Sequence, residues 1–189
     1  EPGAFIRTAN RRDFAIAPPA ATLCDWVQAA GGRVHAVGKI GDIFSMQGID
    51  DVAKGTDRAL MGHLERLVDT AEPGSLTFAN FVEFDSLWGH RRDVSGYARA
   101  LEWFDAAIGP VLARLRPGDL MVLTADHGND PTWPGTDHTR ERVPVLGAGQ
   151  DAGQGGGALG LMAFADVGAT VAAHLGVPAP GAGTDRRPA

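Results

Sequence analysis

The sequence predicts an α/β fold with a mostly parallel sheet that is covered by helices on both faces. Short apolar segments of strand-like composition alternate with segments whose apolar residues recur every three or four positions, as in an amphipathic helix. Glycine or proline separates most of these segments. Alternating strands and helices imply right-handed crossovers, which place parallel strands side by side with helices above and below them.

The first part of the chain is predicted to contain a helix, a strand, a loop and a second helix. Residues 22–30 form the first helix, which Gly31-Gly32 stops, and the β-branched run at 33–37 forms the strand. A loop is expected over residues 38–55. The second helix covers residues 56–70, where leucines recur at helical spacing.

The second part of the chain continues the same alternation. Residues 75–84 are apolar and are predicted to form a buried strand, and residues 94–115 are predicted to form a long amphipathic helix. Further strands are expected at 119–124 and 143–146, and a final helix at 164–175. This part therefore adds strands to the sheet and helices to its faces.

Size and composition indicate a globular domain and exclude some classes of partner. The chain has 189 residues, of which 44% are hydrophobic, enough for one domain with its own core. The formal net charge of −6 argues against nucleic acid, whose phosphates require a basic surface. The most apolar stretch, 159–177, carries Asp166, His174 and several glycines, so no membrane span is expected. With a single cysteine and no secretory signal, a cytoplasmic location is expected.

Five side chains that are suited to metal binding lie in two clusters along the chain. They are Asp85 with His90, and Asp126-His127 with His138. Carboxylate oxygens and imidazole nitrogens together suit Mn or Zn, and two carboxylates with three imidazoles are a ligand set for a two-metal site in phosphate chemistry. The sequence therefore predicts a metal centre.

The predicted strands deliver polar residues to one edge of the sheet. Lys39 follows the first strand, Asp85 the second and Asp126 the third. In open α/β sheets, binding sites form outside the carboxyl ends of the strands. Lys39 is one of only two lysines and could contact a phosphate at this edge, or it could be a solvated surface residue.

Other polar residues are explained more simply by structural roles. Arg91-Arg92-Asp93 directly follow His90 and could hold a phosphate, but we favour a role at the start of the following helix, with Asp93 as its cap. The remaining histidines lie within predicted elements and are expected to be structural or exposed: His35, His63 and His174.

Two longer strings carry a resemblance to a known family. The run from Val82 to Asp93 contains Asp85-Ser86-Leu87-Trp88-Gly89-His90, and the run from Thr124 to Glu141 contains Asp126-His127-Gly128-Asn129-Asp130-Pro131 and Gly135-Thr136-Asp137-His138. Both resemble phosphopentomutases, a family of the alkaline phosphatase superfamily. Segments around Arg7 and Lys39 match family segments in the same order, and the resemblance extends to about Thr184.

The resemblance implies an activity and roles for particular residues. Phosphopentomutases move phosphate between the 1- and 5-positions of ribose or 2-deoxyribose, through a phosphorylated threonine of the enzyme and a bisphosphorylated sugar. It implies small-molecule pentose phosphates as partners and two Mn²⁺ ions as cofactors. One ion would be bound by Asp85, His90 and His138, and the other by Asp126 and His127. Lys39 and Arg7 match basic positions around the substrate phosphate.

The resemblance also implies that this chain corresponds to the C-terminal portion of the family fold, with the N-terminal part of that fold missing. In the family, the nucleophilic threonine and a further aspartate ligand precede an inserted cap domain. Residues 1–19 would be the tail of that cap, and residues 20–189 the C-terminal part of the metal-binding α/β core. The catalytic threonine is then expected outside this chain, and the N-terminal part is a candidate partner.

Two other hypotheses stay open. Another member of the superfamily, such as a cofactor-independent phosphoglycerate mutase or a phosphatase, would share the pattern of aspartate and histidine ligands. The string Pro131-Thr132-Trp133-Pro134-Gly135 favours pentose phosphates over these substrates. The third hypothesis belongs to a different class, a non-catalytic metal-binding fragment.

Overall fold

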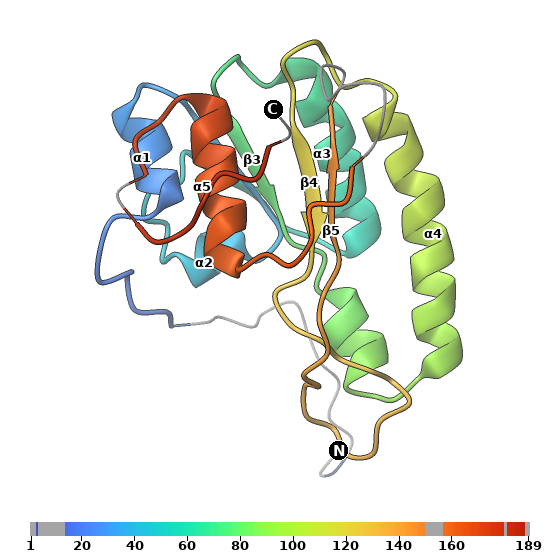
Figure 1. The fold of residues 1–189 in the computed structure, drawn as a ribbon. Coiled ribbons are helices and arrows are strands. Elements are labelled where there is room, and N and C mark those ends of the chain that lie inside the picture. Colours follow the sequence, from blue (N-terminus) through green and yellow to red (C-terminus); the bar gives the residue numbers. More distant parts are fainter. Residues whose placement is uncertain (1–2, 4–13, 150–156, 180, 188–189) are drawn as a thin grey trace.

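The computed structural model describes residues 3, 14–149, 157–179 and 181–187 (Figure 1). Arg7 and most of the expected cap tail therefore lie outside the described residues. The elements follow one another in this order: α1 (Leu23–Ala29), β1 (Val34–Val37), α2 (Ile40–Ile43), β2 (Asp51–Ala53), α3 (Asp57–Thr70), β3 (Leu76–Ala79), the π-helix η1 (Phe84–Gly89), α4 (Val94–Leu112), β4 (Met121–Thr124), β5 (Val145–Ala148) and α5 (Phe164–Leu175).

The strands form a parallel sheet and a separate antiparallel pair. The parallel sheet has the order β2-β1-β3, and His35 of β1 is in register with Asp51 of β2 and Thr77 of β3. This confirms the predicted parallel α/β arrangement. β4 and β5, however, pair with each other in antiparallel fashion. The segment 125–144 between them contains no helix, and a parallel return would require a crossover of that kind.

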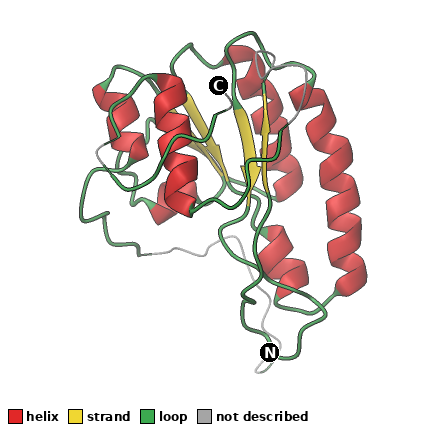
Figure 2. Ribbon diagram, viewed as in Figure 1, coloured by secondary structure: helices red, strands yellow, loops and turns green. Residues whose placement is uncertain are grey.

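Helices cover both faces of the strands (Figure 2). α1, α2 and α5 lie on one side, where Val27, Ala36 and Ala172 belong to one buried core. α3 and α4 lie on the other side, where Met61 and Val111 form a second core against which β4 packs. The prediction of helices on both faces is confirmed.

The predicted helices are confirmed, and their boundaries have local causes. Thr56 Oγ1 accepts a hydrogen bond from the Ala59 amide at the start of α3. The Asp93 carboxylate accepts one from the Gly96 amide at 2.8 Å and begins α4, the capping role expected of it. Gly176, with a φ of +67°, ends α5 in the left-handed conformation that favours glycine. Within the described residues, no helix has both the length and the apolar character needed to cross a bilayer.

Two predictions of local structure were wrong. The expected loop at 38–55 contains the short elements α2 and β2. The strand expected at 75–84 ends at Ala79, because its later apolar residues pack on α4 instead of entering the sheet. The ring of Phe81 contacts Phe104 edge-on at 5.3 Å, and Phe84 contacts both Phe104 and Tyr97 in the same way.

Asp57 joins α3 to the segment that leads into η1. Its side chain is only 2% exposed, and Oδ2 accepts a hydrogen bond from the Glu83 amide at 3.1 Å. Its Oδ1 atom is buried without a hydrogen-bond partner among the described residues. Burial raises the pKa of Asp57 to about 7, from an ordinary value of 3.8. A charged carboxylate at this position therefore destabilises the fold.

We expect Asp57→Asn to abolish a pH dependence of stability. Because the folded-state pKa of Asp57 is raised, its contribution is fully present below about pH 4 and is lost as the pH rises to about 7. The free energy of unfolding of the unchanged chain should fall over this window by up to about 4 kcal/mol more than that of Asp57→Asn. Urea unfolding at pH 4 and pH 8 measures the difference.

The control is Asp105→Asn, which changes an exposed aspartate on α4. It should keep the pH slope of the unchanged chain. An equal slope in Asp57→Asn and the unchanged chain would contradict the role assigned to Asp57.

Candidate metal centre

Two regions of the chain bring the candidate ligands together beyond the ends of β3 and β4 (Figure 1). η1 follows β3 and carries Asp85, and His90 comes directly after its last residue. The long loop after β4 carries Asp126 and His127 near its start and His138 further on. Each region thus supplies a carboxylate and at least one imidazole.

Imidazole nitrogens lie around one oxygen of Asp85. Nε2 of His138 lies 3.2 Å from Asp85 Oδ1, and Nε2 of His90 lies 3.4 Å from the same atom. The ring of His127 stacks on that of His138, with centroids 3.7 Å apart. One ligand atom each of Asp85, His127 and His138 lie within 4.8 Å of one another. Ligands bound about 2.1 Å from one ion are separated by roughly 3–4 Å, so this spacing suits a shared cation.

The hydrogen bonds of two histidines leave one ring nitrogen of each for a metal. Nδ1 of His90 is hydrogen-bonded to the carbonyl oxygen of Thr136, and Nδ1 of His127 lies 3.2 Å from that of Gly128. A carbonyl oxygen only accepts, so in a neutral ring the proton is on Nδ1 and Nε2 presents a lone pair. Histidines that bind metals almost always donate their other N–H in this way.

Asn129 orients the Asp85 carboxylate. Its Nδ2 donates to Asp85 Oδ1 at 2.6 Å, and the side chain is buried at the base of the loop. A backbone bridge between Gly128 and Thr139 closes the loop at this point. The carboxylate that lies closest to the imidazoles is therefore held in one position by a hydrogen bond.

The centre is open to solvent on the side of Asp126. The Asp126 side chain is 77% exposed, against 34% for Asp85, and its Oδ1 lies 3.7 Å from His127 Nε2. All five predicted ligands thus lie in one region of the structure. Among the described residues, Asp85, His127 and His138 are the set that could hold a single ion, and this set draws on both predicted groups. The assignment of ligands to two ions stays a prediction.

The two remaining predicted site residues are Lys39 and Arg7. Lys39 is half-buried between β1 and α2, at the carboxyl end of β1 as expected. Arg7 lies outside the described residues.

The remaining histidines have the structural roles that were expected of them. His35 is 6% exposed, with Nδ1 2.9 Å from Asp51 and Nε2 3.3 Å from Glu72. His174 Nε2 lies 2.9 Å from a backbone carbonyl oxygen at the end of its helix. His63 pairs with Arg66 on α3.

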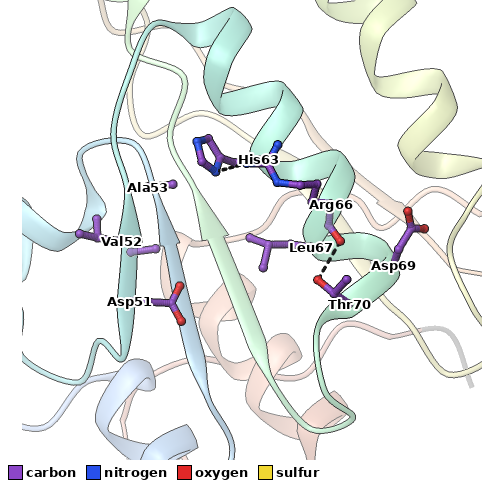
Figure 3. Close-up of a pocket in the computed structure, with 9 residues that line it drawn as sticks. Asp51, Val52, Ala53, His63, Arg66, Leu67, Asp69 and Thr70 are labelled. Atoms are coloured by element: carbon purple, nitrogen blue, oxygen red, sulfur yellow. Dashed lines mark hydrogen bonds between the residues drawn. The ribbon is translucent and has the colours of Figure 1, made fainter.

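Figure 3 shows a separate hollow of about 420 Å³ between β2 and α3. Asp51 of β2 and His63 and Arg66 of α3 line it, and none of the five candidate ligands does. Its charged groups are already paired, since Arg66 bonds His63. The hollow is therefore distinct from the candidate metal centre.

Two residues that support the centre, Asn129 and Arg92, were not predicted to do so from the sequence. Asn129 was seen only as part of a family string, yet it bonds Asp85 directly. Arg92 was assigned to the start of α4, but its guanidinium reaches the loop that carries His138. The one available signal for Arg92 is its position in the string that contains Asp85 and His90.

Comparison with known proteins assigns the family. A family model described as the metalloenzyme superfamily matches residues 6–179. The chain belongs to the metalloenzyme superfamily. The carboxylate and imidazole groups gathered at one end of the strands of this chain agree with membership of a metalloenzyme superfamily.

Relatives of this metalloenzyme chain carry the name phosphopentomutase. The one from Chelativorans sp. (strain BNC1) is 57% identical over 177 residues, which are 93% of this chain and 43% of the relative. The one from Rhizobium meliloti (strain 1021) is 54% identical over 179 residues, or 94% of this chain and 44% of the relative. The predicted resemblance to phosphopentomutases is confirmed, and the chain spans less than half the length of these curated relatives.

We expect His90→Ala and His138→Ala each to weaken Mn²⁺ binding by at least about 10-fold, because each removes an imidazole next to Asp85. Calorimetric titration of the metal-free chain with MnCl₂ measures the dissociation constant. His63→Ala is the matched control, since His63 lines the separate hollow, and it should bind Mn²⁺ as the unchanged chain does. Unchanged Mn²⁺ affinity in both His90→Ala and His138→Ala would contradict the assignment of these histidines as metal ligands.

Proposed function

We propose that the chain is part of a phosphopentomutase, an isomerase that interconverts the 1- and 5-phosphates of ribose or 2-deoxyribose. One observation carries the proposal: donor atoms of Asp85, His127 and His138 converge within 4.8 Å in a chain that is 57% identical to a phosphopentomutase. Hard oxygen and borderline nitrogen ligands suit divalent metals that work on phosphate. The substrates, on this proposal, are small pentose phosphates.

We propose that the residues of the centre hold two divalent ions, both Mn²⁺. Asp85, His90 and His138 would hold one ion, while Asp126 and His127 would hold the other together with a further carboxylate. His90 and His127 fit this role because their Nδ1 atoms are hydrogen-bonded to carbonyl oxygens. When bound, two such ions neutralise charge on a transferring phosphoryl group and clamp the attacking and leaving oxygens.

The substrate phosphate needs positive charge close to it, because the chain as a whole has a net charge of −6. We propose Lys39 and Arg7 as basic contacts to it. Lys39 lies at the carboxyl end of β1, in the parallel sheet whose third strand leads to Asp85. Sites in α/β folds form at such strand ends.

The phosphorylated threonine and the further aspartate are proposed to come from a part of the enzyme outside these 189 residues. Two strand edges support such a partner. Among the described residues, β3 pairs only with β1, and β4 pairs only with β5. Open edges of this kind are templates for another strand. The expected cytoplasmic location is part of the same proposal.

The proposal is tested by expressing the gene with any coding sequence upstream of Glu1. We expect the product to interconvert ribose 1-phosphate and ribose 5-phosphate with Mn²⁺, and His138→Ala to lower kcat/KM by at least about 100-fold, because metal stabilisation of the transferring phosphoryl group is lost. The isolated 189-residue chain should bind Mn²⁺ without turnover. His63→Ala is the control and should retain activity.

The same assay separates the competing hypotheses. Turnover of 3-phosphoglycerate alone would favour a phosphoglycerate mutase-like member of the superfamily and overturn the proposed substrate. Mn²⁺ binding with no turnover of either substrate by the longer product would favour a non-catalytic metal-binding protein. Robust mutase activity of the isolated chain would show that its nucleophile lies within the 189 residues.

A further inference from the structure

Arg92 has an unusual backbone conformation next to the candidate metal centre. Its φ is +54°, in the left-handed region that residues with a Cβ seldom adopt, and it stands between His90 and the Asp93 cap of α4. Such a conformation persists only where surrounding interactions hold it, and it is enriched at functional sites. The contacts of the side chain show what holds it here.

The Arg92 guanidinium donates its hydrogen bonds to uncharged carbonyl and amide oxygens. Nη1 donates to the carbonyl oxygens of Gly89 at 3.0 Å and Asp130 at 3.0 Å, and to Asn129 Oδ1 at 2.7 Å. Nε donates to the carbonyl oxygen of Gly135 at 2.6 Å, and Nη2 donates to that of Asp137 at 2.6 Å. Nε, Nη1 and Nη2 all donate, and because Nη1 carries two N–H groups for three acceptors, its hydrogen bonds are partly shared. The rigid fork of the guanidinium spreads these donors over several acceptors at once.

These acceptors lie on both regions that carry metal ligands. Gly89 belongs to η1, which bears Asp85, whereas Gly135 and Asp137 lie in the loop just before His138. The bond to Asn129 also fixes the orientation of that amide. With Oδ1 of Asn129 occupied by Arg92, its Nδ2 is directed to Asp85.

We propose that Arg92 is a positioning residue that holds the loop 129–137 on η1 and thereby sets the affinity of the metal centre. This inference rests on the proposed metal site and deepens it. Arg92 acts through other groups: it orders Asn129, which orients Asp85, and it fixes the backbone on the N-terminal side of His138. A lysine cannot replace it, because an ammonium has three donors at one point and cannot reach acceptors spread along a loop.

The first arm of the test measures metal affinity in folded protein. Arg92→Lys and Arg92→Met should weaken Mn²⁺ binding by about 10–100-fold, as is typical when a supporting group behind a metal ligand is lost. Arg91→Lys and Arg91→Met are matched controls at the neighbouring, exposed arginine, and they should change the dissociation constant by less than about 2-fold. Circular dichroism confirms that each variant is folded at the temperature of titration.

The second arm measures the loop itself, without metal. Amide hydrogen exchange of residues 129–139 should be faster in Arg92→Lys than in Arg91→Lys, notably at Trp133 and Thr139, whose amides are hydrogen-bonded within the loop. Co²⁺ bound in place of Mn²⁺ should show a changed visible absorption in Arg92→Lys, which reports altered ligand geometry. A residue with a purely global structural role would leave that spectrum unchanged.

The outcomes separate this inference from the proposed function. If Arg92→Met does not fold, Arg92→Lys decides. Wild-type Mn²⁺ affinity, Co²⁺ spectrum and exchange rates in folded Arg92→Lys would overturn the role of Arg92. Lack of Mn²⁺ binding by the unchanged chain would overturn the proposed metal site and the effect on affinity, whereas the exchange measurement judges the attachment of the loop independently.

Discussion

The contact between the Asp85 carboxylate and the nearby imidazoles is the constraint that organises this end of the molecule. Oδ1 of Asp85 lies 3.4 Å from Nε2 of His90, and in the neutral ring the proton is on Nδ1, which is hydrogen-bonded to a carbonyl oxygen. An ionised oxygen and a nitrogen lone pair at that distance repel each other unless a positive charge lies between them. This is the electrostatic reason for regarding the group as a cation site. A simple ion pair would require a protonated ring.

The backbone around Asp85 is shaped to allow this contact. η1 is a π-helix, a wide turn that is frequent at functional sites. Its last residue, Gly89, packs so closely on Asn129 that a Cβ there would lie 2.5 Å from the amide nitrogen that donates to Asp85. Arg92 then closes the arrangement from the other side of the amide. The rigidity of the centre thus comes from a glycine, an amide and a guanidinium, none of which is a metal ligand.

The parts of the molecule that the sequence predicts are those with a repeating or chemically distinctive signal. α3 and α4 follow from apolar residues at helical spacing, and the five candidate ligands were found as aspartates and histidines after apolar segments. The strand expected at 75–84 was too long because apolar composition cannot distinguish pairing in a sheet from packing on α4, as Phe81 and Phe84 do. Arg92 was assigned incompletely because its partners are mainly backbone carbonyl oxygens, which every sequence contains.

On the proposed two-metal assignment, charge balance calls for a further carboxylate beyond the five candidate ligands. Two divalent ions would bring four positive charges, whereas Asp85 and Asp126 supply two negative ones and neutral imidazoles supply none. The excess positive charge would suit a phosphate dianion but would leave an ion beside Asp126 weakly held, because Asp126 is 77% exposed and water would compete for it. A further carboxylate would strengthen that ion and still leave net positive charge for the substrate. The exposed side of the centre and the open edges of β3 and β4 are where a segment bearing such a carboxylate would have to approach.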